Sequence, residues 1–126
     1  MKTFKIPLFI LIVLLLLALL NSAVIHRQCV LWEEAVDHMI SAANDQQWEE
    51  AVSLTKKLQD SWENWADFLR MMTLHDEVED IDLAIKECRI LLSQQNYDTL
   101  SLYVARLRCQ FEHLSEMQAF RISNLL

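Results

Sequence analysis

Apolar and polar positions divide this chain into an uninterrupted apolar run followed by a longer part with helical periodicity. No charged residue occurs in residues 6–25. A helix of about 20 apolar residues just crosses the hydrocarbon layer of a bilayer. Inside lipid a backbone must satisfy its own hydrogen bonds, so this run is predicted to be helical. We therefore expect a transmembrane anchor over residues 6–25.

Beyond the anchor, apolar residues recur at steps of three and four, which is the spacing of one helix face. The pattern predicts that the first helix continues past the anchor as far as Asn44-Asp45, which supplies the break and the N-cap of the next helix. If Asn44 is the cap, Gln47 takes the capping-box position. Three further helices are predicted over residues 46–72, 75–93 and 97–122. Their apolar stripes comprise Trp48, Ala51 or Val52, Thr55, Leu58, Trp62, Trp65, Leu69 and Met72; Leu74, Val78, Ile81, Ile85, Cys88 and Leu92; and Leu100, Val104, Leu107, Phe111 and Leu114, with Met117 and Phe120 extending the last one.

These helices form two hairpins, which predicts an all-α fold: an N-terminal transmembrane helix followed by an antiparallel up-down bundle of about four helices. A faint repeat supports the hairpin arrangement, because Gln46 aligns with Gln95 and Trp62 with Phe111. The chain has no glycine, the residue that supplies most turns with positive φ, so few tight turns are expected. An extended pair of hairpins that needs a partner to complete its core is the alternative.

Charge is distributed unevenly and predicts an orientation. Lys2, Lys5 and Arg27 are the only charged residues among the first 32, so the rest of the chain carries 8 basic and all 18 acidic residues, a net charge of −10. By the positive-inside rule, residues 1–5 stay in the cytoplasm, and residues 26–126 form an acidic helical domain outside the cytoplasmic membrane. The acidic surface excludes nucleic acid as a partner, since such binding needs basic contacts to phosphate.

A cleaved signal peptide is the alternative to a retained anchor. Cleavage after Ala23 would place Asn21 at position −3, where signal peptidase sites have small residues. The sequence therefore favours a single-pass anchor that stays attached.

The most chemically suggestive stretch is residues 75–82, His-Asp-Glu-Val-Glu-Asp-Ile-Asp. On a helix His75 lies above Glu79, and Asp76 above Asp80, so carboxylate oxygens could hold a hard cation such as Ca²⁺. The stretch lacks the spacing and the glycine of an EF-hand loop. We interpret it as a favourable helix N-terminus with a solvated acidic face. A small-ligand or divalent-cation sensor at this site is the alternative function.

Neither catalysis nor cofactor binding is indicated. The chain has no nucleophile elbow and no glycine-rich turn, so we expect no enzymatic activity, no catalytic residue, no cofactor and no metal ligand. Three cysteines without a C-x-x-C pair signal neither a disulfide framework nor a zinc site. Cys88 and Cys109 are expected to be buried free thiols, whereas Cys29 could cross-link a homodimer.

Tryptophans are the candidate interaction residues. Trp48, Trp62 and Trp65 fall on the predicted core stripe, and Trp32 follows the anchor closely enough to lie in an interfacial aromatic belt. Rings that the bundle leaves uncovered would form a partner-binding surface, because aromatic residues dominate interaction hot spots.

Three segments carry a resemblance to a known family: residues 75–82, the Leu91-Leu92 pair, and the tail from Glu112 to Leu126, which ends Ser-Asn-Leu-Leu. Together they resemble the bacterial domain of unknown function 4363 family, small membrane-anchored helical proteins of Firmicutes. The resemblance covers nearly the whole chain and implies a hydrophobic N-terminal helix followed by an acidic helical domain. That family has no assigned activity, so no catalytic residue is carried over.

The expected function is that of a non-enzymatic accessory or protein-interaction module on the outer face of the cytoplasmic membrane. Its expected partners are the lipid bilayer, through residues 6–25, and another membrane or envelope protein. Homo-oligomerisation is left open.

Overall fold

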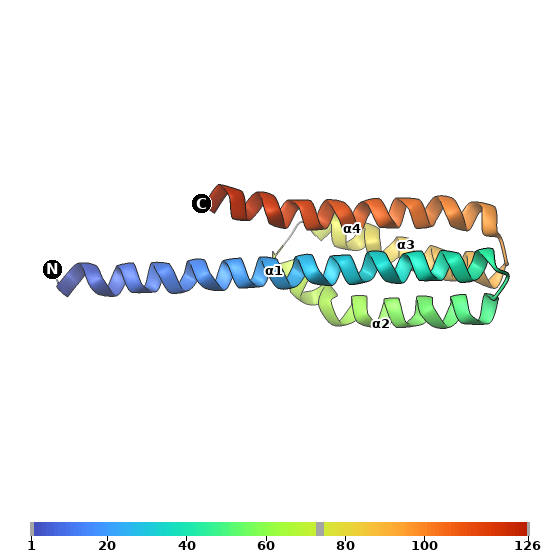
Figure 1. The fold of residues 1–126 in the computed structure, drawn as a ribbon, viewed down its shortest axis with the longest axis horizontal. Helices are drawn as coiled ribbons and strands as arrows, with labels where there is room; N and C mark the ends of the chain where they lie inside the picture. The colour runs from blue at the N-terminus through green and yellow to red at the C-terminus, as the bar shows by residue number, and fades with distance from the viewer. Residues whose placement is uncertain (1, 73–74, 126) are drawn as a thin grey trace.

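The structure is a computed structural model that describes residues 2–72 and 75–125. The described part contains α1 (Lys2–Asn44), α2 (Trp48–Met72), α3 (His75–Ser93) and α4 (Tyr97–Leu125). Successive helices run in opposite directions, and α4 returns to lie beside α1 (Figure 1). The predicted all-α class and the up-down bundle are confirmed.

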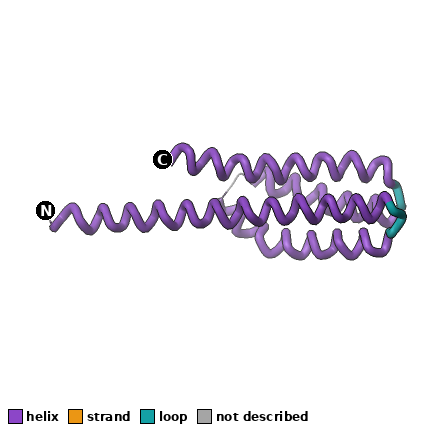
Figure 2. Tube along the Cα trace, in the orientation of Figure 1, coloured by secondary structure: helices purple, strands orange, loops and turns teal. Residues whose placement is uncertain are grey.

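The helices enclose one core, because α1 packs against both α2 and α4, and α3 also packs against both. Both short turns lie at one end of the bundle, and both chain termini point away from that end (Figure 2). We call the opposite end, where the first part of α1 leaves the bundle, the extension end.

Each hairpin has one turn between its two helices, and neither turn contains glycine. After α1, the Gln46 N–H bonds the carbonyl of Ala43 at 3.1 Å and the Gln47 N–H bonds that of Ala42 at 2.9 Å. This crossed pair is a Schellman motif, in which the residue after the C-cap adopts a left-handed conformation. Gln46 does so with a φ of 61°. The second turn repeats the motif with Gln95 at a φ of 53°, with bonds from Gln95 to Leu92 and from Asn96 to Leu91.

This turn geometry corrects the predicted start of the second helix. Asn44 is the last residue of α1 and does not cap α2, which begins at Trp48. The Schellman motif ends α1 after Asn44, and the chain reverses its direction over residues 45–47. In the second turn Asn96 does act as an N-cap, since its Oδ1 accepts a hydrogen bond of 3.3 Å from the Thr99 N–H.

The core follows the predicted stripes closely. The predicted stripe residues of α3 from Val78 onward and those of α4 as far as Leu114 are buried, and Leu74 lies outside the described residues. Phe120, which was predicted to extend the α4 stripe, is 66% exposed, so that part of the prediction is wrong. Trp32, Trp62 and Phe111 meet in the middle of the bundle, with ring centroids 5.1 to 5.8 Å apart. Trp62 meets both other rings edge to face, a contact that adds stability beyond the burial of apolar area. Three helices, α1, α2 and α4, are thereby joined at one point.

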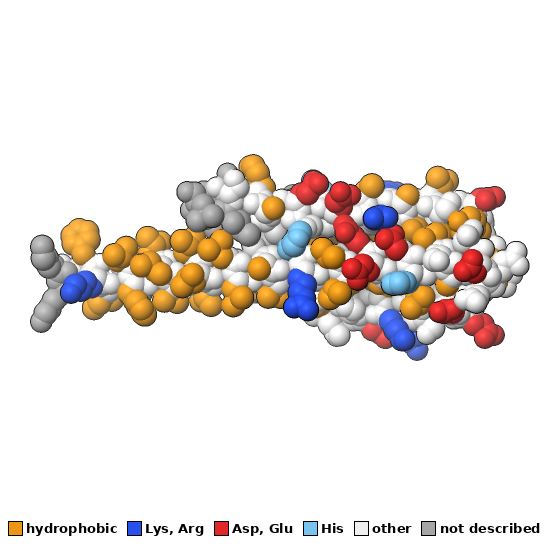
Figure 3. Space-filling model, viewed as in Figure 1, with side chains coloured by type: hydrophobic (Ala, Val, Ile, Leu, Met, Phe, Trp, Pro, Cys, Tyr) orange, Lys and Arg blue, Asp and Glu red, His pale blue; other side chains and the backbone are white. Residues whose placement is uncertain are grey.

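The first part of α1 projects beyond the bundle. All side chains of residues 3–14 are exposed, and the first buried side chains are those of Ser22 and Ile25. Figure 3 shows apolar side chains covering this projection, whereas acidic side chains gather over the bundle. We call residues 3–20 the apolar extension. By length and composition, this part of α1 could cross a membrane.

Candidate functional site

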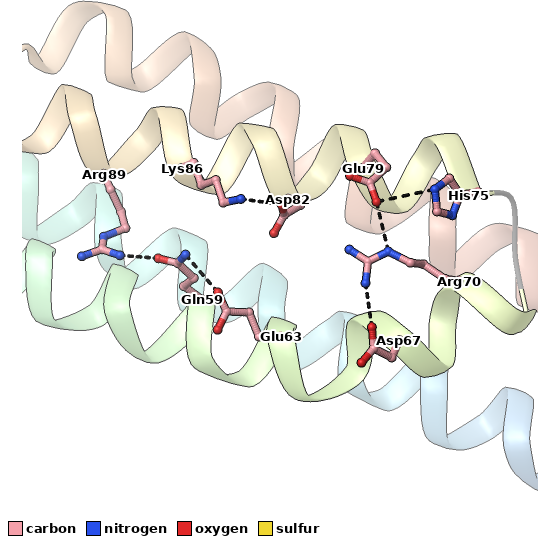
Figure 4. Close-up of polar contacts among 9 residues, drawn as sticks. All are labelled: Gln59, Glu63, Asp67, Arg70, His75, Glu79, Asp82, Lys86 and Arg89. Carbon is pink, nitrogen blue, oxygen red and sulfur yellow. Dashed lines mark hydrogen bonds and ion pairs between the residues drawn. The ribbon is translucent and has the colours of Figure 1, made fainter.

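The acidic start of α3 is engaged in contacts with neighbouring helices. Arg70, near the end of α2, donates from Nε to Glu79 Oε1 at 3.0 Å and from Nη1 to Asp67 Oδ1 at 2.8 Å (Figure 4). His75 Nε2 lies 3.7 Å from the same Glu79 oxygen. The hydrogen bond that Arg70 donates to Glu79 is the main reason that the pKa of Arg70 is raised. Glu79 therefore joins α3 to α2.

The other candidate acidic residues do not converge on a common point. Asp76 and Asp80 are exposed. Glu77, between them in sequence, contacts His113 of α4 at 3.2 Å. Over residues 2–72 and 75–125, no three His, Cys, Asp or Glu side chains are grouped so that they could hold a metal ion. The structure thus brings His75 and Glu79 together and leaves Asp76 and Asp80 facing solvent.

The same side of α3 carries two more polar contacts along its length. Arg89 Nη1 donates to Gln59 Oε1 of α2 at 2.6 Å, and Lys86 Nζ lies 2.9 Å from Asp82 Oδ2 (Figure 4). Hydrogen bonding to Asp82 raises the pKa of Lys86. Polar side chains therefore line the α2–α3 seam from one end to the other, as expected of a solvated bundle edge.

The four candidate tryptophans separate into two pairs. Trp32 and Trp62 are buried, and the Trp32 Nε1–H donates to Ser61 Oγ at 3.0 Å. Their surface is used inside the core and is not available to a partner. Trp48 and Trp65 are half-buried at the edge of the core. Trp48 lies beside the turns, whereas Trp65 lies near the extension end.

An apolar groove opens at the extension end, between α1 and α2. Its volume is about 730 Å³. The lining comprises Leu17, Ala18, Leu20, Asn21 and Val24 of α1 with Asn64, Trp65 and Phe68 of α2. Trp65 and Phe68 meet edge to face, with ring centroids 5.9 Å apart. The groove can therefore accept an apolar group beside two aromatic rings.

Sequence reasoning missed this groove because it treated α2 as having a single apolar face. Phe68 and Met71 are 38% and 85% exposed, and neither belongs to the predicted core stripe. With Trp65, they recur at steps of three, which marks a second apolar strip toward the end of α2. That spacing was the signal available in the sequence.

On another face of α1, polar side chains form hydrogen bonds with the C-terminal part of α4. The Ser22 hydroxyl donates to Gln118 Oε1 at 3.4 Å, and His26 Nδ1 shares a hydrogen bond with Ser115 Oγ. Ser22, Ser115 and Gln118 are all buried. A buried polar group is tolerated when it finds a partner. These contacts hold α1 in place at the level of the groove.

The cysteines are three free thiols in two environments. Burial raises the pKa of both Cys29 and Cys88 to about 12. Cys109 is exposed, so its predicted burial is wrong. The reason is its register: Leu107 and Phe111 occupy the core-facing positions on either side of it.

Comparison with known proteins gives one match. The model of the family described as Domain of unknown function (DUF4363) matches residues 19–125, which include the whole bundle and the last part of the apolar run. No curated protein and no solved structure matches the chain.

Proposed function

Because the chain belongs to the domain of unknown function 4363 family, as the sequence motifs suggested, we propose that it is a single-pass, membrane-anchored helical module without enzymatic activity. Its acidic bundle would stand on the outer face of the cytoplasmic membrane and bind another membrane or envelope protein. The observation that carries the proposal is the apolar extension, whose side chains from residue 3 to residue 14 are all exposed.

Exposure is what separates this helix from an ordinary core helix. An apolar helix in a soluble protein hides its side chains, whereas only 11% of the most apolar part of α1 is buried. Large contiguous apolar surfaces on a folded chain mark contact with a membrane or a partner. A bilayer would cover such a surface on all sides.

Orientation is supported by the charges on the two sides of the apolar extension. Lys2 precedes it, Lys5 lies in its first turn, and the bundle that follows is strongly acidic. Basic residues are retained on the cytoplasmic side of a span. The charge distribution therefore supports a bundle on the outer side.

An accessory binding role is supported by what the bundle exposes. Leu83 and Ile90 of α3 are each 57% exposed, and Leu102 of α4 is 72% exposed. Trp48 and Trp65 keep part of their rings at the surface. These side chains offer contacts to a partner protein.

The test of anchoring uses the full-length chain in native membranes. We expect it to resist carbonate extraction, to keep the mass of all 126 residues, and to be digested by protease added from outside intact cells. Recovery of the intact chain in the soluble fraction, loss of the apolar extension, or protection of the bundle from external protease would each contradict this.

The test of partner binding places a photo-cross-linker at an exposed position. Incorporation at Ile90 should give a discrete adduct in membranes, while incorporation at the buried Val36 should give none and serves as the matched control. Absence of both a partner adduct and a self-adduct at Leu83, Ile90 and Leu102 would count against the interaction role.

A further inference from the structure

The groove between α1 and α2 lies at the level where the apolar extension would leave the hydrocarbon layer. The predicted span, residues 6–25, rises by about 30 Å at 1.5 Å per residue. The hydrocarbon core of a bilayer is about 30 Å thick. The α1 residues that line the groove lie between Leu17 and Val24, in the last part of this span, so the groove lies beside the acyl chains next to the headgroups.

The lining changes in polarity along the helix axis in the same sense as the bilayer. Leu17 and Leu20 belong to the apolar extension and are 56% and 62% exposed. One turn further into the bundle come Asn21 and then Val24. Arg27 follows on the stripe of Leu20 and Val24 and is exposed. A cation in this position suits a lipid phosphate.

The α2 side of the groove has the residues typical of a membrane interface. Tryptophan is enriched where hydrocarbon meets headgroups, because its ring is apolar and its N–H is polar. Trp65 is half-buried, and Phe68, which touches it, is 38% exposed. The neighbouring Asn64 completes the lining with an amide.

A lipid chain suits this groove better than a partner helix. Helices that pack closely in membranes use small residues at their contacts. The α1 side of the groove has Leu17, Leu20 and Val24, with Ala18 as its one small residue, and the chain has no glycine. The groove is also continuous with the exposed surface of the apolar extension, along which acyl chains would already lie.

We propose that this groove binds an acyl chain of a phospholipid in the outer leaflet, which seats the end of α2 in the membrane interface. The volume of about 730 Å³ is in the range of ligand pockets. This inference rests on the anchoring part of the proposed function. The bound lipid would fix the tilt of the bundle relative to the bilayer and so the surface that it offers to a partner.

The experiment reconstitutes the full chain in vesicles of phosphatidylglycerol and phosphatidylethanolamine that contain a phospholipid brominated along its acyl chain. Bromine quenches tryptophan emission only at close range. The emission should be partly quenched, and W65F should lose most of that quenching. W48F is the matched control: it removes a half-buried tryptophan of the same helix at the far end and should keep the quenching.

A second measurement leaves the sequence unchanged and so does not depend on the folding of a variant. A phospholipid with a diazirine in its acyl chain should label α2 at residues 64–68 as well as the apolar extension. Labelling confined to residues 3–16, or quenching that persists in W65F, would overturn the proposal. A second copy or a partner helix in the groove would exclude lipid and give the same negative result.

Flotation of each variant with the vesicles separates the two proposals. If the chain does not float, anchoring itself fails. If it floats but shows neither Trp65-dependent quenching nor label on α2, only the groove proposal fails.

Discussion

Glu33 shows how the bundle shifts the chemistry of a single side chain. Burial is the main cause that raises its pKa, and the carboxylate of Glu112 on α4 raises it further. Arg108 acts in the opposite direction but is also paired with Asp37 at 3.0 Å. Local helix formation does not cause this pKa shift, because Glu33 and Glu112 come together only when α4 packs on α1.

Replacing Glu33 should stabilise the bundle at neutral pH. Its pKa is higher in the folded than in the unfolded chain, so ionised Glu33 opposes folding above that folded pKa. This loss of folding stability decreases as the pH falls toward 4.5, the ordinary pKa of a glutamate side chain. Glu33→Gln should therefore raise the melting temperature at neutral pH and flatten its rise on mild acidification.

The control is Glu34→Gln, which removes the same charge from an exposed position on the same turn. Melting curves followed by circular dichroism over a pH series would compare the two. Equal effects of both variants would show that general charge repulsion, and not the site of Glu33, is responsible.

At the scale of the elements, the two hairpin turns are the least expected feature. A glycine-free chain predicts few tight turns, yet both turns use the left-handed conformation that glycine adopts most easily. Gln46 and Gln95 supply it instead. The alignment of these residues in the faint internal repeat therefore has a structural meaning, because each closes a helix with the same pair of crossed hydrogen bonds.

Glycine at either position should stabilise the hairpin. A non-glycine residue in the left-handed region costs about 1–2 kcal/mol. Part of that is offset by the greater freedom of glycine in the unfolded chain, so we expect Gln46→Gly and Gln95→Gly each to gain about 0.5–1 kcal/mol. Chemical unfolding, with the midpoint as readout, measures the gain.

Gln94→Gly is the matched control, since Gln94 is adjacent to Gln95 but is not among the residues with positive φ. There glycine should destabilise by about 0.5–1 kcal/mol. A loss of stability in all three variants would contradict the strain argument.

At the scale of the whole molecule, the bundle decides which thiols can react. Cys29 and Cys88 contribute to the core from α1 and α3, and Cys109 faces outward from α4. The thiolate is the reactive form, and a pKa of about 12 leaves almost none of it at neutral pH. Burial also blocks access by a reagent.

Thiol labelling thus reports on the integrity of the bundle. In the folded chain we expect a water-soluble reagent to modify Cys109 alone, and all three cysteines to react after unfolding. The mass of the labelled protein counts the modified sites. Fast labelling of Cys29 or Cys88 in the folded state would show that the core opens. Cys109→Ser is the control, and its folded form should take up no label.

Local sequence patterns were sufficient to predict the helices and most of the core residues. Steps of three and four assign a buried face wherever one stripe dominates, as in α3, where Val78, Ile81 and Ile85 are buried as predicted. They fail where a helix has a second contact surface. Phe68 was missed for this reason, and Cys109 was misplaced because a cysteine suits either a core or a surface position.

The sequence by itself determined the elements: a long apolar helix, three helices with apolar stripes, and an acidic surface, since each depends on residues close together in the chain. The tertiary structure alone decided what lies between elements. It paired Arg70 with Glu79, placed the groove where α1 and α2 meet, and put Trp32 against Trp62. Such contacts depend on the packing of side chains far apart in sequence, which periodicity does not encode.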